Sequence, residues 1–155
     1  MIIALIHSKL PDYEPVGKSI GTNTCRRPRC NTCPYVHNQN MIFGNSGRYI
    51  KIRSRFTCTS ESVVYCISCE NCDSLYIGQT GRRLADRVTE HLRDIKTNSA
   101  DKPVARHFNS LGHNIENLKV CILKKVDNTN RRIQFESFII KNLKTVYPFG
   151  MNLDL

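Results

Sequence analysis

The segment from residue 63 to residue 78 constrains the fold of this chain more than any other part of it. Two apolar runs, Val63-Val64-Tyr65 and Tyr76-Ile77-Gly78, flank a short polar stretch. Apolar, β-branched runs separated by a tight turn are typical of a β-hairpin. We therefore expect two adjacent antiparallel strands here, which belong to a small sheet.

The two tyrosines set the predicted register of this hairpin. If Tyr65 pairs with Tyr76, then Cys69 pairs with Cys72, and Glu70-Asn71 forms a two-residue turn. Because side chains alternate along a strand, both tyrosines and both cysteines would face one way, and the opposite face would carry Cys66, Leu75 and Ile77. A metal-binding turn could shift this register.

The two runs resemble the halves of the GIY-YIG nuclease signature, and residues 79–87 together with His91 continue that pattern. A Cys-x-x-Cys between the halves and a pair of histidines after them make residues 21–152 similar to the endonuclease domain of Penelope-like retroelements. The first half is Val-Val-Tyr, which lacks the glycine and isoleucine of the signature but keeps the tyrosine. The resemblance implies a DNA endonuclease with Mg²⁺ at its catalytic centre and zinc in its framework.

The remaining pattern predicts an α+β fold: a small antiparallel three-stranded sheet flanked by helices, with an N-terminal zinc-bearing β-hairpin appendage. Residues 1–20 would form an irregular lead-in, residues 21–60 a Cys-rich basic zinc-binding segment, and residues 61–155 the nuclease domain. The appendage hairpin would comprise residues 41–43 and 48–53, the third strand of the sheet residues 118–126, and the helices residues 81–96, 102–111 and 130–144. We expect Thr80 to cap the first helix and Gly112 to end the second.

Lysine and arginine outnumber aspartate and glutamate by 23 to 13 in the 155 residues, which gives a net charge of +10. This excess favours a polyanionic partner, here DNA. The apolar stretch at residues 1–6 is too short for a signal peptide or a membrane span, so we expect an intracellular, nuclear protein with no membrane partner. Eight cysteines in a reducing compartment favour metal binding, and a disulfide-rich secreted interaction domain is the alternative. The sequence does not indicate the oligomeric state.

Two groups of residues have the spacing of zinc ligands. In the first, here called the hairpin cluster, the resemblance implies a tetrahedral site made by Cys69, Cys72, His107 and His113. In the second, the N-terminal cluster, the ligands are Cys25, Cys30, Cys33 and, as the most economical fourth ligand, Cys58, with His37 as the rival. Both sites would be structural, because catalysis by zinc needs an open coordination position. Cys66 and Cys121 lie in apolar surroundings and are expected to be inert core thiols.

Glu136 is predicted to lie inside the apolar arc of the last helix, between Ile133, Ile140 and Leu143. A carboxylate in that position needs a partner or a cation. A salt bridge to an arginine is one interpretation, and the resemblance implies the other, a magnesium ligand. Mg²⁺ commonly takes one or two protein carboxylates and completes its coordination with water and phosphate oxygens.

Arg87 and His91 lie one helical turn apart, beside the apolar arc of the first helix. By resemblance Arg87 engages the phosphodiester, for which its guanidinium fork is suited. His91 would orient the attacking water or contact the phosphate, and a packed helix histidine is the alternative. Tyr65 and Tyr76 are the candidate general bases. A free phenol has a pKa of about 10, so nearby positive charge must favour the phenolate. The resemblance implies that Asn152 supports the site.

Basic residues concentrate around the N-terminal cluster and beside the tyrosines, where they could neutralise phosphates. The predicted substrate-binding residues are Gly78, Thr80, Arg82, Arg83, Lys51, Arg53 and Arg55. The predicted function is magnesium-dependent hydrolysis of DNA phosphodiester bonds that nicks target DNA for retroelement insertion. A reverse transcriptase domain in a longer polyprotein would then be a partner. The alternative is a catalytically inactive, zinc-dependent nucleic-acid-binding module.

Overall fold

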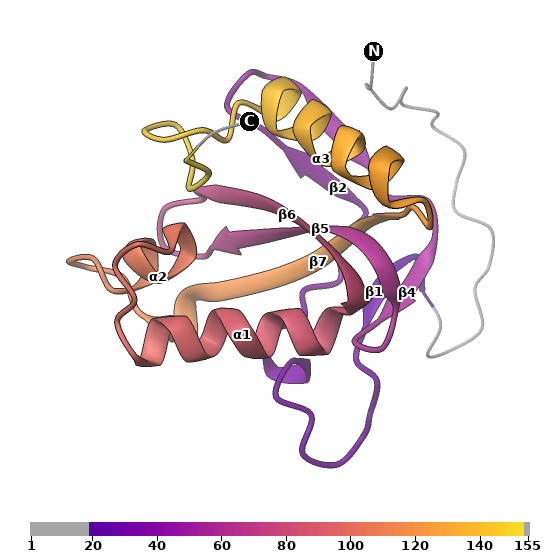
Figure 1. The fold of residues 1–155 in the computed structure, drawn as a ribbon, viewed down its shortest axis with the longest axis horizontal. Coiled ribbons are helices and arrows are strands. Elements are labelled where there is room, and N and C mark those ends of the chain that lie inside the picture. The colour runs from indigo at the N-terminus through magenta and orange to yellow at the C-terminus, as the bar shows by residue number, and fades with distance from the viewer. Residues whose placement is uncertain (1–18, 154–155) are drawn as a thin grey trace.

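The computed structural model describes residues 19–153, which form three layers (Figure 1). The middle layer is an antiparallel sheet with the strand order β6-β5-β7, made of β5 (Glu61–Cys69), β6 (Leu75–Arg83) and β7 (Leu118–Lys125). The predicted α+β fold with a three-stranded sheet is therefore confirmed. Apart from residues 19 and 20, the predicted lead-in lies outside the described residues.

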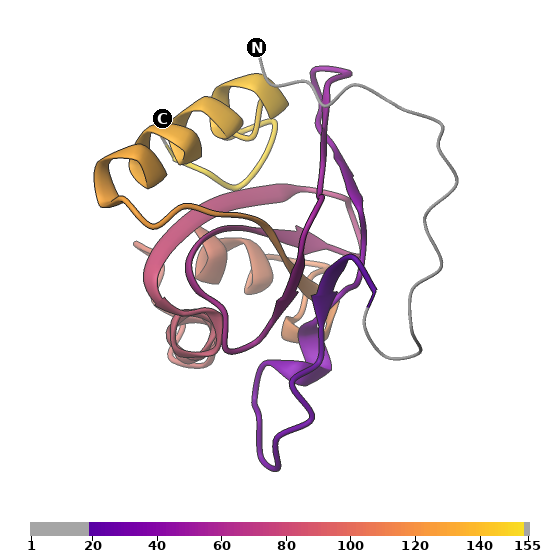
Figure 2. The same cartoon turned by 90° about the vertical axis from the view of Figure 1, so that its right-hand side faces the viewer.

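Helices cover one face of this sheet, and the N-terminal segment covers the other (Figure 2). The helical layer holds α1 (Leu84–Lys96) and α3 (Thr129–Leu143), and α2 (Pro103–Phe108) packs beside α1. Because both faces of the central strand are covered, β5 is buried almost continuously from residue 63 to residue 69. Among the described residues, no helix is long and apolar enough to cross a bilayer.

The N-terminal layer consists of two small sheets. β2 (Met41–Phe43) and β3 (Tyr49–Lys51) form the predicted antiparallel hairpin. The predicted second strand over residues 48–53 is too long, because the chain leaves β3 after residue 51. A separate strand, β4 (Arg55–Thr57), instead pairs in parallel with β1 (Gly21–Asn23), and the short turn η1 (Cys33–Tyr35) lies between β1 and β2.

The N-terminal layer also completes the outer edge of β7. The backbone N–H of Ile122 donates to Thr22 Oγ1 at 2.7 Å, and the N–H of His37 donates to the carbonyl of Val120 at 2.9 Å. An uncovered edge strand leaves a row of unpaired backbone groups. Residues 19–57 are thus packed against the sheet that carries the nuclease signature.

The predicted register of the tyrosine hairpin is wrong by two residues. Tyr65 pairs with Gly78, and Tyr76 pairs with Ile67, so the turn after Cys69 contains four residues instead of two. A two-residue shift leaves every side chain on its predicted face, because the side-chain period of a strand is two. The two tyrosines therefore still lie on the same face of the sheet, but they are two positions apart along the strands instead of directly opposite each other. The longer turn is the one that the hairpin cluster occupies.

The helix ends also differ from the prediction. β6 continues to Arg83, paired with Glu61, so α1 begins at Leu84 and Thr80 lies in the strand instead of capping the helix. α2 ends at Phe108, four residues before Gly112. The predicted buried arc of α1 is confirmed, with Leu84, Val88, Leu92 and Ile95 all buried.

Candidate active site

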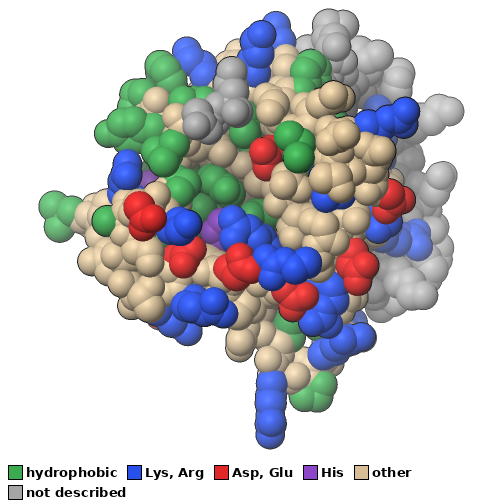
Figure 3. Space-filling view, in the orientation of Figure 1, with side chains coloured by type: hydrophobic (Ala, Val, Ile, Leu, Met, Phe, Trp, Pro, Cys, Tyr) green, Lys and Arg blue, Asp and Glu red, His purple; other side chains and the backbone are tan. Residues whose placement is uncertain are grey.

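A hollow lies between α1 and α3 above the sheet, with apolar side chains on its floor and Lys or Arg side chains along its lower rim (Figure 3). Tyr65 and Tyr76 come from adjacent strands, and their ring centroids lie 6.4 Å apart. His91 of α1 packs edge-on against both rings at 5.9 and 5.5 Å. Its Nε2 lies 2.7 Å from the Tyr65 hydroxyl. Two strands and a helix thus contribute to one cluster of polar side chains, in which Tyr65 and His91 are 26 residues apart in the sequence.

The protonation states in this cluster follow from burial. Burial, and secondarily Arg87, lowers the pKa of His91 to about 3, so the imidazole is neutral at pH 7. In the Nδ1–H tautomer of the neutral imidazole, Nε2 accepts the hydrogen bond that the Tyr65 hydroxyl donates. Burial also raises the pKa of Tyr65 and of Tyr76, although Arg87 lowers both. In the folded chain, the desolvation of the phenols therefore outweighs Arg87. That Arg87 together with a bound metal ion favours the phenolate stays a prediction.

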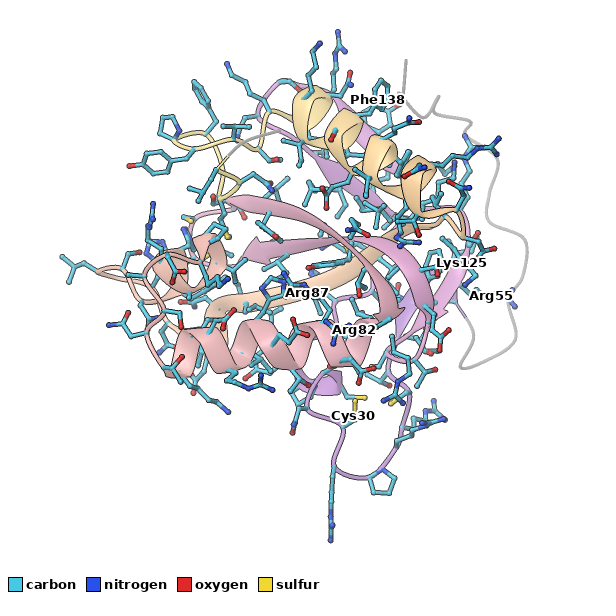
Figure 4. The ribbon with its side chains drawn as sticks, viewed as in Figure 1. Cys30, Arg55, Arg82, Arg87, Lys125 and Phe138 are labelled. Atoms are coloured by element: carbon cyan, nitrogen blue, oxygen red, sulfur yellow. The ribbon has the colours of Figure 1, made fainter. Side chains whose placement is uncertain are left out.

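Arg87 of α1 is drawn between its helix and the sheet in Figure 4, and it acts on the pKa of both phenols. Burial lowers the pKa of Arg87, but its acidic neighbours Tyr65, Tyr76 and Glu90 raise it by more, so the guanidinium stays protonated. Nη1 donates to Glu90 Oε2 at 2.7 Å. Glu90 also pairs with Arg82, and Arg82 and Arg87 hold the pKa of this carboxyl below its usual range. Glu90 orients the arginine, and its three-residue spacing from Arg87 is the signal that could have identified it.

Glu136 of α3 belongs to the same cluster. Its negative charge contributes to the raised pKa of both Tyr65 and Tyr76. The side chain is half-buried, and one member of its predicted apolar arc, Ile133, is 44% exposed. The carboxylate therefore acts on both phenols from α3, a different helix from the one that carries Arg87. A half-buried carboxylate near oxygen donors suits a hard divalent cation.

Gly78 and Asn152 shape the sheet beneath the phenols. A Cβ at residue 78 would lie 2.5 Å from the Tyr65 hydroxyl, so glycine leaves the space that this hydroxyl occupies. Asn152 is buried, and its amide accepts from the N–H of Ile77 and donates to the carbonyl of the same residue, both at 2.9 Å. It thereby fixes the strand segment next to Tyr76. Both residues position the phenols. Gly78 does so because it has no side chain, which leaves room for the Tyr65 hydroxyl, and not because of an unusual backbone conformation.

Arg132 was not identified from the sequence, yet its side chain is buried. Its Nε donates to Gln79 Oε1 at 2.8 Å, and Nη1 donates to the carbonyls of Val126 and Asp127. These bonds connect α3 to β6 one helical turn before Glu136. Sequence gave no signal for this role, since an arginine near a helix start is ordinarily solvated.

Both groups of predicted zinc ligands come together. In each cluster, the four ligand atoms lie within 4.8 Å of one another. Ligands of a tetrahedral zinc ion lie about 3.8 Å apart when the Zn–S bonds are about 2.3 Å. The observed Cys25–Cys33 and Cys33–Cys58 sulfur distances are 3.5 and 3.6 Å, and Cys72 Sγ lies 3.5 Å from His107 Nε2.

Two further observations bear on these clusters. Within the described residues, the buried Nε2 of His113 makes no protein hydrogen bond, so its lone pair is available to a metal ion. His37 lies outside the N-terminal cluster, where Cys58 occupies the fourth corner. All eight cysteines are free thiols, and Cys66 and Cys121 are buried in the core as expected.

The predicted substrate-binding residues are less closely grouped. Arg82 pairs with Glu90 and Arg83 with Asp86 on the rim of the hollow. Thr80 Oγ1 accepts from the N–H of Arg82. Arg55 lies far to the right of Arg87 in Figure 4. Together with Lys51 and Arg53, it belongs to the N-terminal layer and not to the cluster around Tyr65 and Tyr76.

The comparisons agree with this geometry. Residues 61–152 match the family model described as "GIY-YIG catalytic domain". The chain belongs to the GIY-YIG family. Its fold is similar to the solved structure of the catalytic domain of the homing endonuclease I-TevI, with a TM-score of 0.51 and 23% identity. That match covers 61% of this chain and 100% of the other. No match was found among curated proteins. The GIY-YIG match thus includes both tyrosines, Arg87, His91, Glu136 and Asn152.

Proposed function

We propose that this GIY-YIG protein is a catalytically competent, magnesium-dependent DNA endonuclease. The observation that carries the proposal is the convergence of Tyr65, Tyr76 and Arg87 with Glu136, although the four residues come from four different elements. A hydrolase for phosphodiesters needs a proton acceptor, a cationic phosphate clamp and a carboxylate for a metal ion. The proposed site contains each of these groups.

In the proposed reaction, a water oxygen attacks phosphorus and the bond from phosphorus to the leaving oxygen breaks. The proton of the water passes to the phenol pair, and Tyr65 passes a proton to His91 Nε2 along their 2.7 Å hydrogen bond. The negative charge of the phosphodiester offsets the contribution of Arg87 to the low pKa of His91, while burial, the larger cause, remains. His91 therefore holds the proton only transiently and passes it on to the leaving oxygen. No resting phenolate is required. Arg87 binds the phosphate oxygens through its guanidinium fork.

Glu136 is the residue that would hold Mg²⁺. Bound there, the ion would stabilise negative charge that develops on the phosphate and leaving oxygens. The hairpin cluster and the N-terminal cluster would each hold a structural zinc ion, because four protein ligands leave no open coordination position. Arg82, Arg83, Lys51, Arg53 and Arg55 would add phosphate contacts along the DNA.

The biological role that we propose is the nicking of target DNA by a Penelope-like retroelement, in the nucleus, with a reverse transcriptase domain as partner. This role is supported by the Cys-x-x-Cys inside the tyrosine hairpin and by the two later histidines. The four side chains lie close enough together to bind one zinc ion, as the resemblance to such an endonuclease implies.

Nicking of supercoiled plasmid, with and without Mg²⁺, tests the proposal. We expect the wild type to nick only with Mg²⁺, and Arg87→Ala and Glu136→Gln each to reduce the rate about a hundredfold or more. Arg93→Ala is the matched control, because Arg93 is exposed on the same helix, outside the cluster. A folded, zinc-loaded wild type that nicks no form of DNA would refute the proposal.

One observation favours the second candidate, an inactive zinc-dependent nucleic-acid-binding module. The raised pKa of both phenols leaves no preformed base at neutral pH. Under this alternative, the wild type and the Glu136→Gln variant would bind DNA equally and neither would nick it.

A further inference from the structure

The loop that follows α3 exposes large apolar side chains. Tyr147, Phe149 and Leu153 are 68%, 51% and 47% exposed, within seven residues of one another. Single exposed apolar residues are ordinary, whereas a contiguous group marks an interaction surface. In Figure 3 the apolar surface at the upper left, where this loop lies, continues into the floor of the hollow.

The loop is held firmly, so its exposed rings are displayed on a rigid base. The N–H of Tyr147 donates to the carbonyl of Asn152 at 2.7 Å, and the side chain of Asn45 donates to the carbonyl of Phe149 at 2.6 Å. At Gly150, an added Cβ would lie 2.4 Å from the carbonyl oxygen of Thr145. A preorganised surface loses little conformational entropy when it binds.

The same loop is attached directly to the catalytic strand. Met151 donates its N–H to the carbonyl of Leu75, and Asn152 binds both backbone groups of Ile77. These two β6 residues flank Tyr76. The loop therefore forms a lip of the hollow, and a substrate phosphate that reaches Tyr76 and Arg87 brings the adjoining nucleotides to this lip.

Cations accompany the exposed rings. Lys144 Nζ lies 3.9 Å above the ring of Phe149. Arg106 of α2 and Tyr147 line a small cavity of about 210 Å³ between α2 and the loop. Aromatic faces next to lysine and arginine are suited to nucleotides, because bases stack on the rings while phosphates meet the cations. This charge complementarity favours DNA over an apolar protein surface.

We propose that Tyr147 and Phe149 form a wedge that contacts unstacked bases next to the scissile phosphate. The inference rests on the proposed function and extends it to the substrate, a duplex that is distorted at the cut. Apolar wedges at base steps partly unstack the bases and bend the duplex. Flexible pyrimidine–purine steps, or bases that are already unpaired, would therefore be preferred.

The test uses the full chain with Glu136→Gln to prevent cutting, and a duplex that carries 2-aminopurine at a central TA step. Anisotropy reports affinity, and 2-aminopurine fluorescence rises when the base leaves the stack. We expect the double variant Tyr147→Ala/Phe149→Ala to bind about tenfold more weakly and to abolish the rise. Tyr147→Phe/Phe149→Tyr, which keeps both rings, should preserve both signals.

Phe43→Ala is the matched control, since Phe43 is 65% exposed but lies in the N-terminal layer, and it should behave as the parent protein does. Unchanged affinity and an unchanged fluorescence rise in the double alanine variant would overturn the wedge and leave the nuclease proposal intact. A self-associating parent that becomes monomeric in the double variant would assign the rings to a second copy of the chain, which also overturns it. A parent that binds no DNA would overturn both proposals.

Discussion

The substitution Gly78→Ala tests the central geometry of the site most directly. The new Cβ would lie 2.5 Å from the Tyr65 hydroxyl oxygen and 2.9 Å from a ring carbon of Tyr76. Tyr65 is fully buried and pairs with residue 78 across the two strands, so its ring has no free space to enter. The phenol must shift by about 1 Å to restore normal contact, which breaks its hydrogen bond to His91.

The expected cost has two parts. Overpacking a core costs about 1 to 3 kcal/mol, and a lost hydrogen bond adds about 0.5 to 1.5 kcal/mol, so we expect a loss of about 2 to 4 kcal/mol in the free energy of unfolding. For a domain of this size that lowers the Tm by about 5 to 10 °C. Urea titration and thermal melting measure both quantities, and we expect DNA nicking to fall with them.

Gly81→Ala is the control in the same strand. Its Cβ would lie 3.1 Å from Nη2 of Arg132, a tight contact without the overlap found at residue 78. Because Arg132 is buried and hydrogen-bonded, we expect a loss of about 1 kcal/mol, smaller than that of Gly78→Ala. A Gly78→Ala protein as stable as Gly81→Ala, with normal nicking, would refute the conclusion that residue 78 must leave space for the Tyr65 hydroxyl.

Two further predictions concern protons and metal. The folded pKa of His91, about 3, lies below its ordinary 6.5, so the unfolded chain binds the extra proton and stability is lost as the pH falls below about 6.5. Denaturant titrations should show that the wild type loses about 2 kcal/mol more than His91→Gln between pH 7.5 and pH 5, and parallel losses would contradict the buried neutral imidazole. Zinc analysis should find two ions per wild-type chain and one in either Cys33→Ala or Cys72→Ala, with equal zinc in all three arguing against two separate sites.

The sequence determined much of the framework. Alternating and apolar runs identified the tyrosine hairpin, β7 and the buried arc of α1, because local periodicity reflects which side chains face the core. Ligand spacing likewise indicated the N-terminal cluster, and spacing together with the family resemblance indicated the hairpin cluster. Local pattern failed at the hairpin turn, where a four-residue loop moved the pairing from Tyr65–Tyr76 to Tyr65–Gly78. Pairs of residues across strands depend on turn geometry, which the apolar pattern does not encode.

Tertiary structure alone decided the chemistry of the site. The sequence could name Tyr65 and Arg87, but not that burial raises the pKa of the phenol despite the arginine. The roles of Glu90 and Arg132 depended in the same way on which side chains the folded chain brings together. The spacing of a motif shows which residues are candidates for the site. The burial of their side chains, and their contacts with residues distant in the sequence, arise only when α1, α3 and the sheet come together around one hollow.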